Sequence, residues 1–231
     1  MNKFVGTFVV CMALAWAGAT SALAAGTPNP NVAPVNSRPG GLSYGQWTEA
    51  WTTWLAGIDS KQSPAFDTTG ANCGVHQTAK AWFLAGSGGT GPVVRSCTIP
   101  GGKAGIFFPI ITNECSDLEG TTPATYPVLL ACAQQFAAAN VEADLDGVQI
   151  ADLNSANSPY HISSPSLFGF QAVPGNAITS GMGGTVHASA VDGYWLFLHP
   201  LSAGAHTLHF HGEFPAAPFT VDVTYHLTIA G

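Results

Sequence analysis

Three histidines near the C-terminus have a spacing that could support metal chemistry. His209 and His211 lie two residues apart in the segment 205–212, and His226 lies in the segment 220–229. Successive side chains of a strand point to opposite faces, so both segments, taken as strands, place these histidines opposite their apolar residues. If the two strands pair over one core, facing residues lie about 5 Å apart. Three imidazoles with an open coordination position are typical of a catalytic zinc or copper site.

The same three histidines also fit a simpler structure. An antiparallel sheet that turns one face to water carries polar residues there, and the imidazoles would then be solvated or hydrogen-bonded. Glu213 and Asp222 lie close enough to act as further metal ligands or as hydrogen-bond partners of the rings. The metal-dependent enzyme is therefore one hypothesis, and a polar outer face is the commoner arrangement.

A second group of candidate residues is acidic. Glu114, Asp117 and Glu119 lie within six residues of one another. Two carboxyl groups in different environments can act as acid and base in glycoside cleavage. Acidic side chains are mostly exposed, so we favour the interpretation that these three form a solvated loop beside a disulfide.

A tryptophan stripe predicts a helix over residues 44–58, with Ser43 as its N-cap. Trp47, Trp51, Trp54 and Leu55 fall on one face of this helix. The stripe is either an aromatic platform for a sugar or lipid, or a face that packs on a sheet. Helical apolar stripes usually face a core, and we favour the second interpretation.

The cysteines indicate two disulfides. Cys73, Cys97, Cys115 and Cys132 remain once a signal peptide is removed, and an even count in an exported protein favours pairing. Four cysteines allow three connectivities. We expect Cys73–Cys97 and Cys115–Cys132, because each pair closes a short local excursion.

The remaining pattern predicts a mainly β protein: an antiparallel β-sandwich, with the jelly roll as one form, plus the N-terminal helix and one short internal helix over 126–140. Asp146-Gly147 favours a hairpin turn. Segments 93–99 and 104–112 are expected to pair around a Pro-Gly turn. Three C-terminal segments are expected to form an antiparallel meander: 194–199, 205–212 and 220–229.

The N-terminus has the composition of a secretory signal over residues 1–25. Lys3 precedes a short apolar run that ends in small residues. Residues 26–42 are rich in Pro, Gly and Asn, which predicts a flexible arm, and 43–231 is expected to be one β-rich domain. No later segment is long and apolar enough to cross a membrane, so we expect no transmembrane segment in the mature chain.

Composition narrows the choice of partner. Charged residues make up 8% of the chain, apolar residues 46%, and the net charge is −7. So few cations cannot neutralise a phosphate backbone, which excludes nucleic acid as an expected partner. Low charge suits a secreted extracellular or periplasmic module that binds a neutral ligand, such as a carbohydrate, another small molecule or a cell-surface component.

Several segments resemble a group of secreted bacterial proteins generally labelled hypothetical. The resemblance implies export and a single domain, and it carries no activity, cofactor or site residue with it. It rests on the following segments: YGQW at 44–47, TTGANC at 68–73, WFLAG at 82–86, CTIP at 97–100, FFPI at 107–110, NECS at 113–116 and DGYW at 192–195.

Overall fold

The computed structural model describes residues 1, 29, 31–77, 79–88 and 91–231. The signal-peptide prediction for residues 1–25 therefore lies outside the described residues, apart from Met1. No helix among the described residues is long and apolar enough to cross a membrane.

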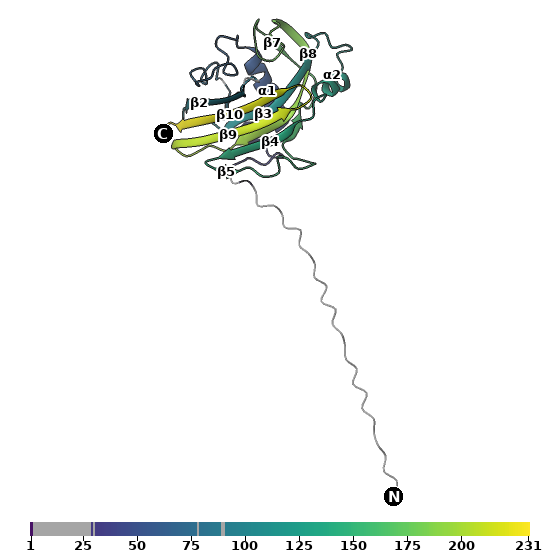
Figure 1. The fold of residues 1–231 in the computed structure, drawn as a ribbon. Helices are drawn as coiled ribbons and strands as arrows, with labels where there is room; N and C mark the ends of the chain where they lie inside the picture. The colour runs from purple at the N-terminus through teal and green to yellow at the C-terminus, as the bar shows by residue number, and fades with distance from the viewer. Residues whose placement is uncertain (2–28, 30, 78, 89–90) are drawn as a thin grey trace.

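Ten described strands form two packed sheets (Figure 1), so the prediction of a mainly β sandwich is confirmed. We call the first the middle sheet; its order is β1-β3-β8-β6, and β7 also pairs with β8. Its members are β1 (Trp82–Phe83), β3 (Ile106–Ser116), β6 (His161–Ser163), β7 (Phe168–Ala172) and β8 (Gly184–Leu198).

We call the second the outer sheet, and its order is β2-β10-β9-β4-β5. Its members are β2 (Gly91–Ile99), β4 (Ala139–Leu145), β5 (Val148–Gln149), β9 (Gly204–Phe214) and β10 (Phe219–Ile229). Two of the described strand pairs, β1 with β3 and β2 with β10, are parallel, and the others are antiparallel. The sandwich is thus mixed rather than purely antiparallel.

Period-two alternation builds the core between the sheets. In β10, the apolar residues Val221, Val223 and Leu227 are buried. Phe108 of the middle sheet meets Phe210 of β9 at a ring-centroid distance of 4.9 Å. Alternating strands therefore have one face in this core and the other in solvent, as expected for an outer layer.

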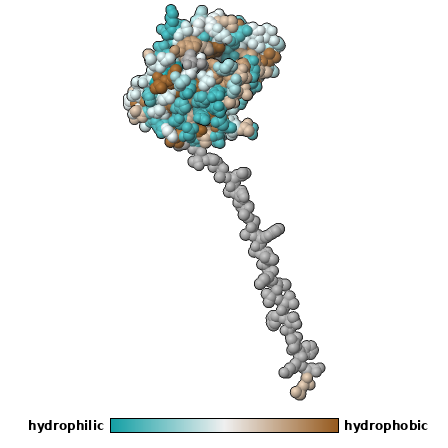
Figure 2. All heavy atoms as spheres, in the orientation of Figure 1, coloured by the Kyte–Doolittle hydropathy of each residue, from teal (hydrophilic) through white to brown (hydrophobic). Residues whose placement is uncertain are grey.

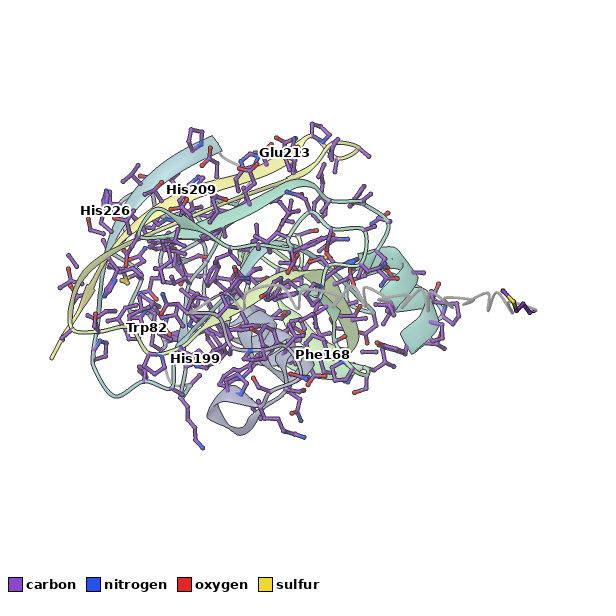
Figure 3. All side chains as sticks on the ribbon, turned by 90° about the horizontal axis from the view of Figure 1, so that it is seen from below. Trp82, Phe168, His199, His209, Glu213 and His226 are labelled. Atoms are coloured by element: carbon purple, nitrogen blue, oxygen red, sulfur yellow. A yellow bond between two sulfur atoms is a disulfide. The ribbon has the colours of Figure 1, made fainter. Side chains whose placement is uncertain are left out.

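A helix makes the third layer. Helix α1 (Tyr44–Ala56) begins in a capping box formed by Ser43 and Gln46. It covers the face of the middle sheet that looks away from the outer sheet, where Trp51 packs edge-on against Trp195 at 5.3 Å. Figure 3 shows α1 and the yellow strands β9 and β10 on opposite sides of the molecule. The tryptophan stripe thus packs on a sheet, as predicted.

Two predicted strand pairings are wrong. Segment 194–199 belongs to β8 in the middle sheet, so it does not extend the β9–β10 hairpin into a meander. Likewise 93–99 and 104–112 lie in β2 and β3, which belong to different sheets. The physical reason lies in their patterns: 194–199 and 104–112 are nearly continuous apolar runs, and the middle sheet is covered on both faces.

The predictions of the hairpin turn and of the disulfides are confirmed. The hairpin turn at Asp146-Gly147 joins β4 to β5. Both predicted disulfides form, Cys73–Cys97 and Cys115–Cys132. Helix α2 (Tyr126–Ala133) is shorter than the predicted 126–140, because the chain enters β4 at Ala139.

The described part of the predicted arm packs on the domain instead of extending from it. Ala33 is fully buried and donates its backbone N–H to the carbonyl of Phe197 at 2.8 Å. Val32 forms a bridge to Leu198, and a short 3₁₀ turn spans Pro39–Gly41. Residues 31–33 thus cover the end of β8.

A buried guanidinium ties two loops to the outer sheet. Arg95 of β2 is almost completely buried. Its nitrogens donate to four backbone carbonyls and to the Tyr225 hydroxyl, at 2.6–3.3 Å. The carbonyls belong to residues 65, 67, 85 and 86. One side chain therefore fixes a segment before the first disulfide loop and a segment inside it.

We predict that Arg95→Met lowers the free energy of unfolding by about 3–5 kcal/mol, because several buried carbonyls lose a charged donor. The expected fall in Tm is roughly 10 °C for a domain of this size. Thermal unfolding followed by circular dichroism measures it. The matched control is Lys80→Met, which removes an exposed cation. An equal and small effect in both variants would refute the structural role of Arg95.

Candidate functional site

The three predicted histidines do share one face. His209 pairs with Thr224, His211 with Asp222 and His226 with Thr207 across the β9–β10 ladder. All lie on the solvent face of the outer sheet, and Figure 3 shows His209, His226 and Glu213 along this side. Figure 2 shows mainly hydrophilic atoms where Figure 1 places β4, β9 and β10.

Carboxylates, however, surround two of these rings. The ring nitrogens of His209 lie 3.3 Å from Asp144 and 3.1 Å from Asp222. Nε2 of His211 lies 3.0 Å from Glu213. His226 is exposed, and within the described part of the chain no group of three or more His, Cys, Asp or Glu side chains is arranged to hold a metal ion. The geometry therefore matches a hydrogen-bonded polar face.

The aromatic platform is not formed by the tryptophans. All five tryptophans outside residues 1–25 are buried. The three tryptophans of α1 face the middle sheet. Their indole rings therefore pack in the core: Trp47, Trp51, Trp54, Trp82 and Trp195.

The acidic group behaves in two ways. Asp117 accepts backbone N–H groups of His187 and Ala188, which is a structural role at the start of β8. Glu119 accepts hydroxyl hydrogen bonds from Ser116 and Ser180. Glu114 differs from the solvated loop that we favoured. Its Oε2 atom is buried without a hydrogen bond of standard geometry among the described residues, although the side chains of Ser116 and Glu119 also interact with this carboxyl.

Glu114 lines a pocket of about 200 Å³, which we call the Glu114 pocket. It lies beside β3 beyond the end of β1, between α1 and the first residues of β10. Most of its walls are apolar. They include the following residues: Trp51, Thr52, Leu55, Ala65, Gly86, Gly88, Pro109, Ile110, Ile111, Ala177, Ile178, Val191, Phe219 and Val221.

Burial gives Glu114 an unusual proton affinity. Loss of water around the carboxyl raises its pKa to about 8. The hydroxyls of Ser189, which donates to Oε1, and of Ser116 oppose this rise, whereas the charge and the hydrogen bond of Glu119 add to it. At neutral pH Glu114 is therefore mostly a neutral acid that can donate a hydrogen bond. The closeness of Glu119 thus favours the protonated form of Glu114.

Thr52 adds a second polar atom to this pocket. The residue is fully buried on α1, and its Oγ1 has no hydrogen-bond partner among the described residues. Buried polar atoms are nearly always paired. Thr52 Oγ1 without a described partner, and Glu114 Oε2 without a hydrogen bond of standard geometry, are what a ligand with matching polar groups would satisfy.

The sequence pointed to Glu114 but missed Thr52 and Ser189. Thr52 lies in the predicted helix between Trp51 and Trp54, where only the aromatic residues stood out. Ser189 reaches Glu114 because β3 and β8 pair, and the segments are 75 residues apart. Only that pairing reveals the contact.

Comparisons with known proteins give no relative. No family model, no curated protein and no solved structure matches the chain.

We predict that Glu114→Gln gains stability over the wild type as pH rises. The wild-type carboxyl has a pKa of about 8 in the fold and about 4.3 when unfolded. Between these two pH values the folded protein therefore binds one proton more than the unfolded chain. The contribution of this proton to the free energy of unfolding is complete below about pH 4 and is lost as the pH rises through 8. Glutamine does not titrate and can still accept from Ser189.

Thermal unfolding at pH 4, 6 and 8.5 measures the effect. The Tm difference, variant minus wild type, should grow with pH. Glu142→Gln, at an exposed position on β4, is the control and should show a nearly constant difference. A constant difference for Glu114→Gln as well would show that the carboxyl is not held protonated.

Proposed function

We propose that this protein is an exported single-domain protein that binds a small neutral molecule in the Glu114 pocket. The observation that carries the proposal is a pair of buried polar atoms in an otherwise mostly apolar pocket. Thr52 Oγ1 has no described partner, and Glu114 Oε2 lacks a hydrogen bond of standard geometry. Apolar walls with a few placed polar groups are typical of small-molecule sites.

The size of the pocket supports a ligand of one ring. A cavity of about 150 Å³ holds benzene, and this pocket measures about 200 Å³. The protonated Glu114 would donate to a carbonyl or ether oxygen of the ligand, while the Thr52 hydroxyl can donate or accept. A neutral ring with one or two polar atoms fits these groups better than a sugar does, because a sugar carries many hydroxyls.

Charge also favours a neutral ligand. A carboxylate in the pocket would lose its water in an apolar site and would lie near Glu119. A cation would lose its water as well. It would regain part of this free energy by favouring the ionised form of Glu114 and pairing with the carboxylate. Charged ligands are therefore expected to bind more weakly than a neutral one of the same shape.

Export is supported by two features. Both disulfides form in the fold, and disulfides persist in oxidising compartments. Residues 1–25 have the composition of a signal peptide. The ligand would then be met outside the cytoplasm.

Three probes of one shape test the neutral site: benzamide, benzoate and benzamidine. We expect benzamide to raise Tm by about 3–6 °C at ten times its Kd, since such a concentration adds roughly 1.4 kcal/mol of stability. Benzoate and benzamidine should bind at least tenfold more weakly. Equal binding of all three, or a preference for benzamidine, would contradict the proposal.

Three variants locate the binding. Ala177→Leu fills the pocket from its wall and should abolish the benzamide shift, whereas Ala216→Leu, at an exposed position, should leave it intact. Thr52→Val keeps the shape of the side chain and removes the hydroxyl, so a several-fold loss of affinity is expected. Benzamide binding that survives Ala177→Leu would place the site elsewhere.

A further inference from the structure

A second cluster of side chains lies near α2, on the face of the middle sheet opposite to the one that carries Glu114. Asp192 of β8 is almost fully buried. Its Oδ1 accepts hydrogen bonds from Ser163 Oγ at 2.6 Å and from Gln134 Nε2 at 3.1 Å. Its Oδ2 lies 2.7 Å from Nε2 of His161. Every partner of this carboxyl group is a donor, so Asp192 acts as an acceptor on both oxygens.

His161 is held in place by two contacts. The carboxylate of Asp192 fixes Nε2, and the ring stacks on Tyr194 at 4.8 Å with an interplanar angle of 2°. The side chain remains 46% exposed. Within the described residues no hydrogen-bond partner reaches its other nitrogen, Nδ1.

This imidazole borders a cleft of about 390 Å³. Phe136 and Phe214, whose rings lie 5.8 Å apart, form an apolar wall with two alanines, and Tyr194 and Gln134 complete the lining. The cleft thus offers apolar surface beside one oriented ring nitrogen.

The hydrogen bond to Asp192 decides what that nitrogen can do. A carboxylate only accepts, so in the neutral ring Nε2 carries the proton and Nδ1 presents a lone pair. The same hydrogen bond raises the pKa of His161, so Nδ1 presents this lone pair at a pH above that raised pKa. We propose that this cleft is a binding site for neutral ring compounds that carry an O–H or N–H donor, with His161 Nδ1 as the acceptor. Asp192 is its positioning residue, because it sets the tautomer through His161.

The proposed ligand differs from that of the Glu114 pocket. In the Glu114 pocket a protonated carboxyl favours ligands with a hydrogen-bond acceptor. In the cleft beside His161 the lone pair of Nδ1 favours ligands with a hydrogen-bond donor. The two sites therefore give opposite preferences, and success or failure at one does not decide the other.

Phenol and anisole test the proposal in the wild-type protein. The two rings are similar in shape, and only phenol carries a donor. At a pH where the NMR titration of His161 shows a neutral ring, long-range nitrogen–proton spectra should show the proton on Nε2. Phenol should shift the His161 signals and bind about tenfold more tightly than anisole at this site.

Asp192→Asn reverses the tautomer with little change of shape. Ser163 and Gln134 keep the amide oxygen at the Oδ1 position, so the amide nitrogen faces Nε2 and donates to it. The ring proton then moves to Nδ1, and the preference for phenol over anisole should fall to about one. Asp152→Asn, at an exposed position, should retain the tenfold preference.

Three results would overturn the proposal: a wild-type proton on Nδ1, equal binding of phenol and anisole at His161, or a tenfold preference that persists in Asp192→Asn. The first two are measured on the wild-type protein, so they decide the matter even if the variant fails to fold.

Discussion

The interior of this protein depends on burying one positive charge without leaving it unsatisfied. The Arg95 side chain is buried on the inner face of the outer sheet. It donates hydrogen bonds to four backbone carbonyls and to the Tyr225 hydroxyl. The Asp67 carboxylate lies near enough to feel this charge. Although partial burial acts in the opposite direction, the N–H groups of Asn72 and Thr69, the Thr69 hydroxyl and the charge of Arg95 hold the pKa of Asp67 below its ordinary value. A buried charge tolerates little movement of its partners.

That constraint reaches the Glu114 pocket. Ala65 and Gly86, whose carbonyls accept from Arg95, also line the pocket. Arg95 thus fixes part of the pocket wall. A rigid wall allows an apolar pocket to stay open, and it allows polar atoms in the lining to remain unpaired at a cost of about 1–3 kcal/mol each.

Much of the local structure could be predicted from the sequence. The alternation of residues 220–229 placed His226 on the solvent face, and the spacing of the cysteines gave both disulfides. The sheet that each strand joins was harder to predict, although the continuous apolar run at 194–199 carried the information: a strand covered on both faces does not alternate. The environment of Glu114 could not be predicted, because Ser189 and Ile178 reach it only through the packing of distant segments.

The two proposed sites follow from one strand pair. In the β3–β8 ladder, Glu114 faces Val191 and the next pair joins Asn113 to Asp192. Because neighbouring pairs point to opposite faces, Glu114 lies on the side of α1 and Asp192 on the side of the outer sheet. The same few residues thus present a donor on one face and, through His161, an acceptor on the other. His209 and His211 on the solvent face of the outer sheet have no comparable freedom, since carboxylates already lie at their ring nitrogens. A polar atom without a hydrogen-bond partner beside apolar walls, more than the presence of titratable residues, distinguishes the two sites from the rest of the surface.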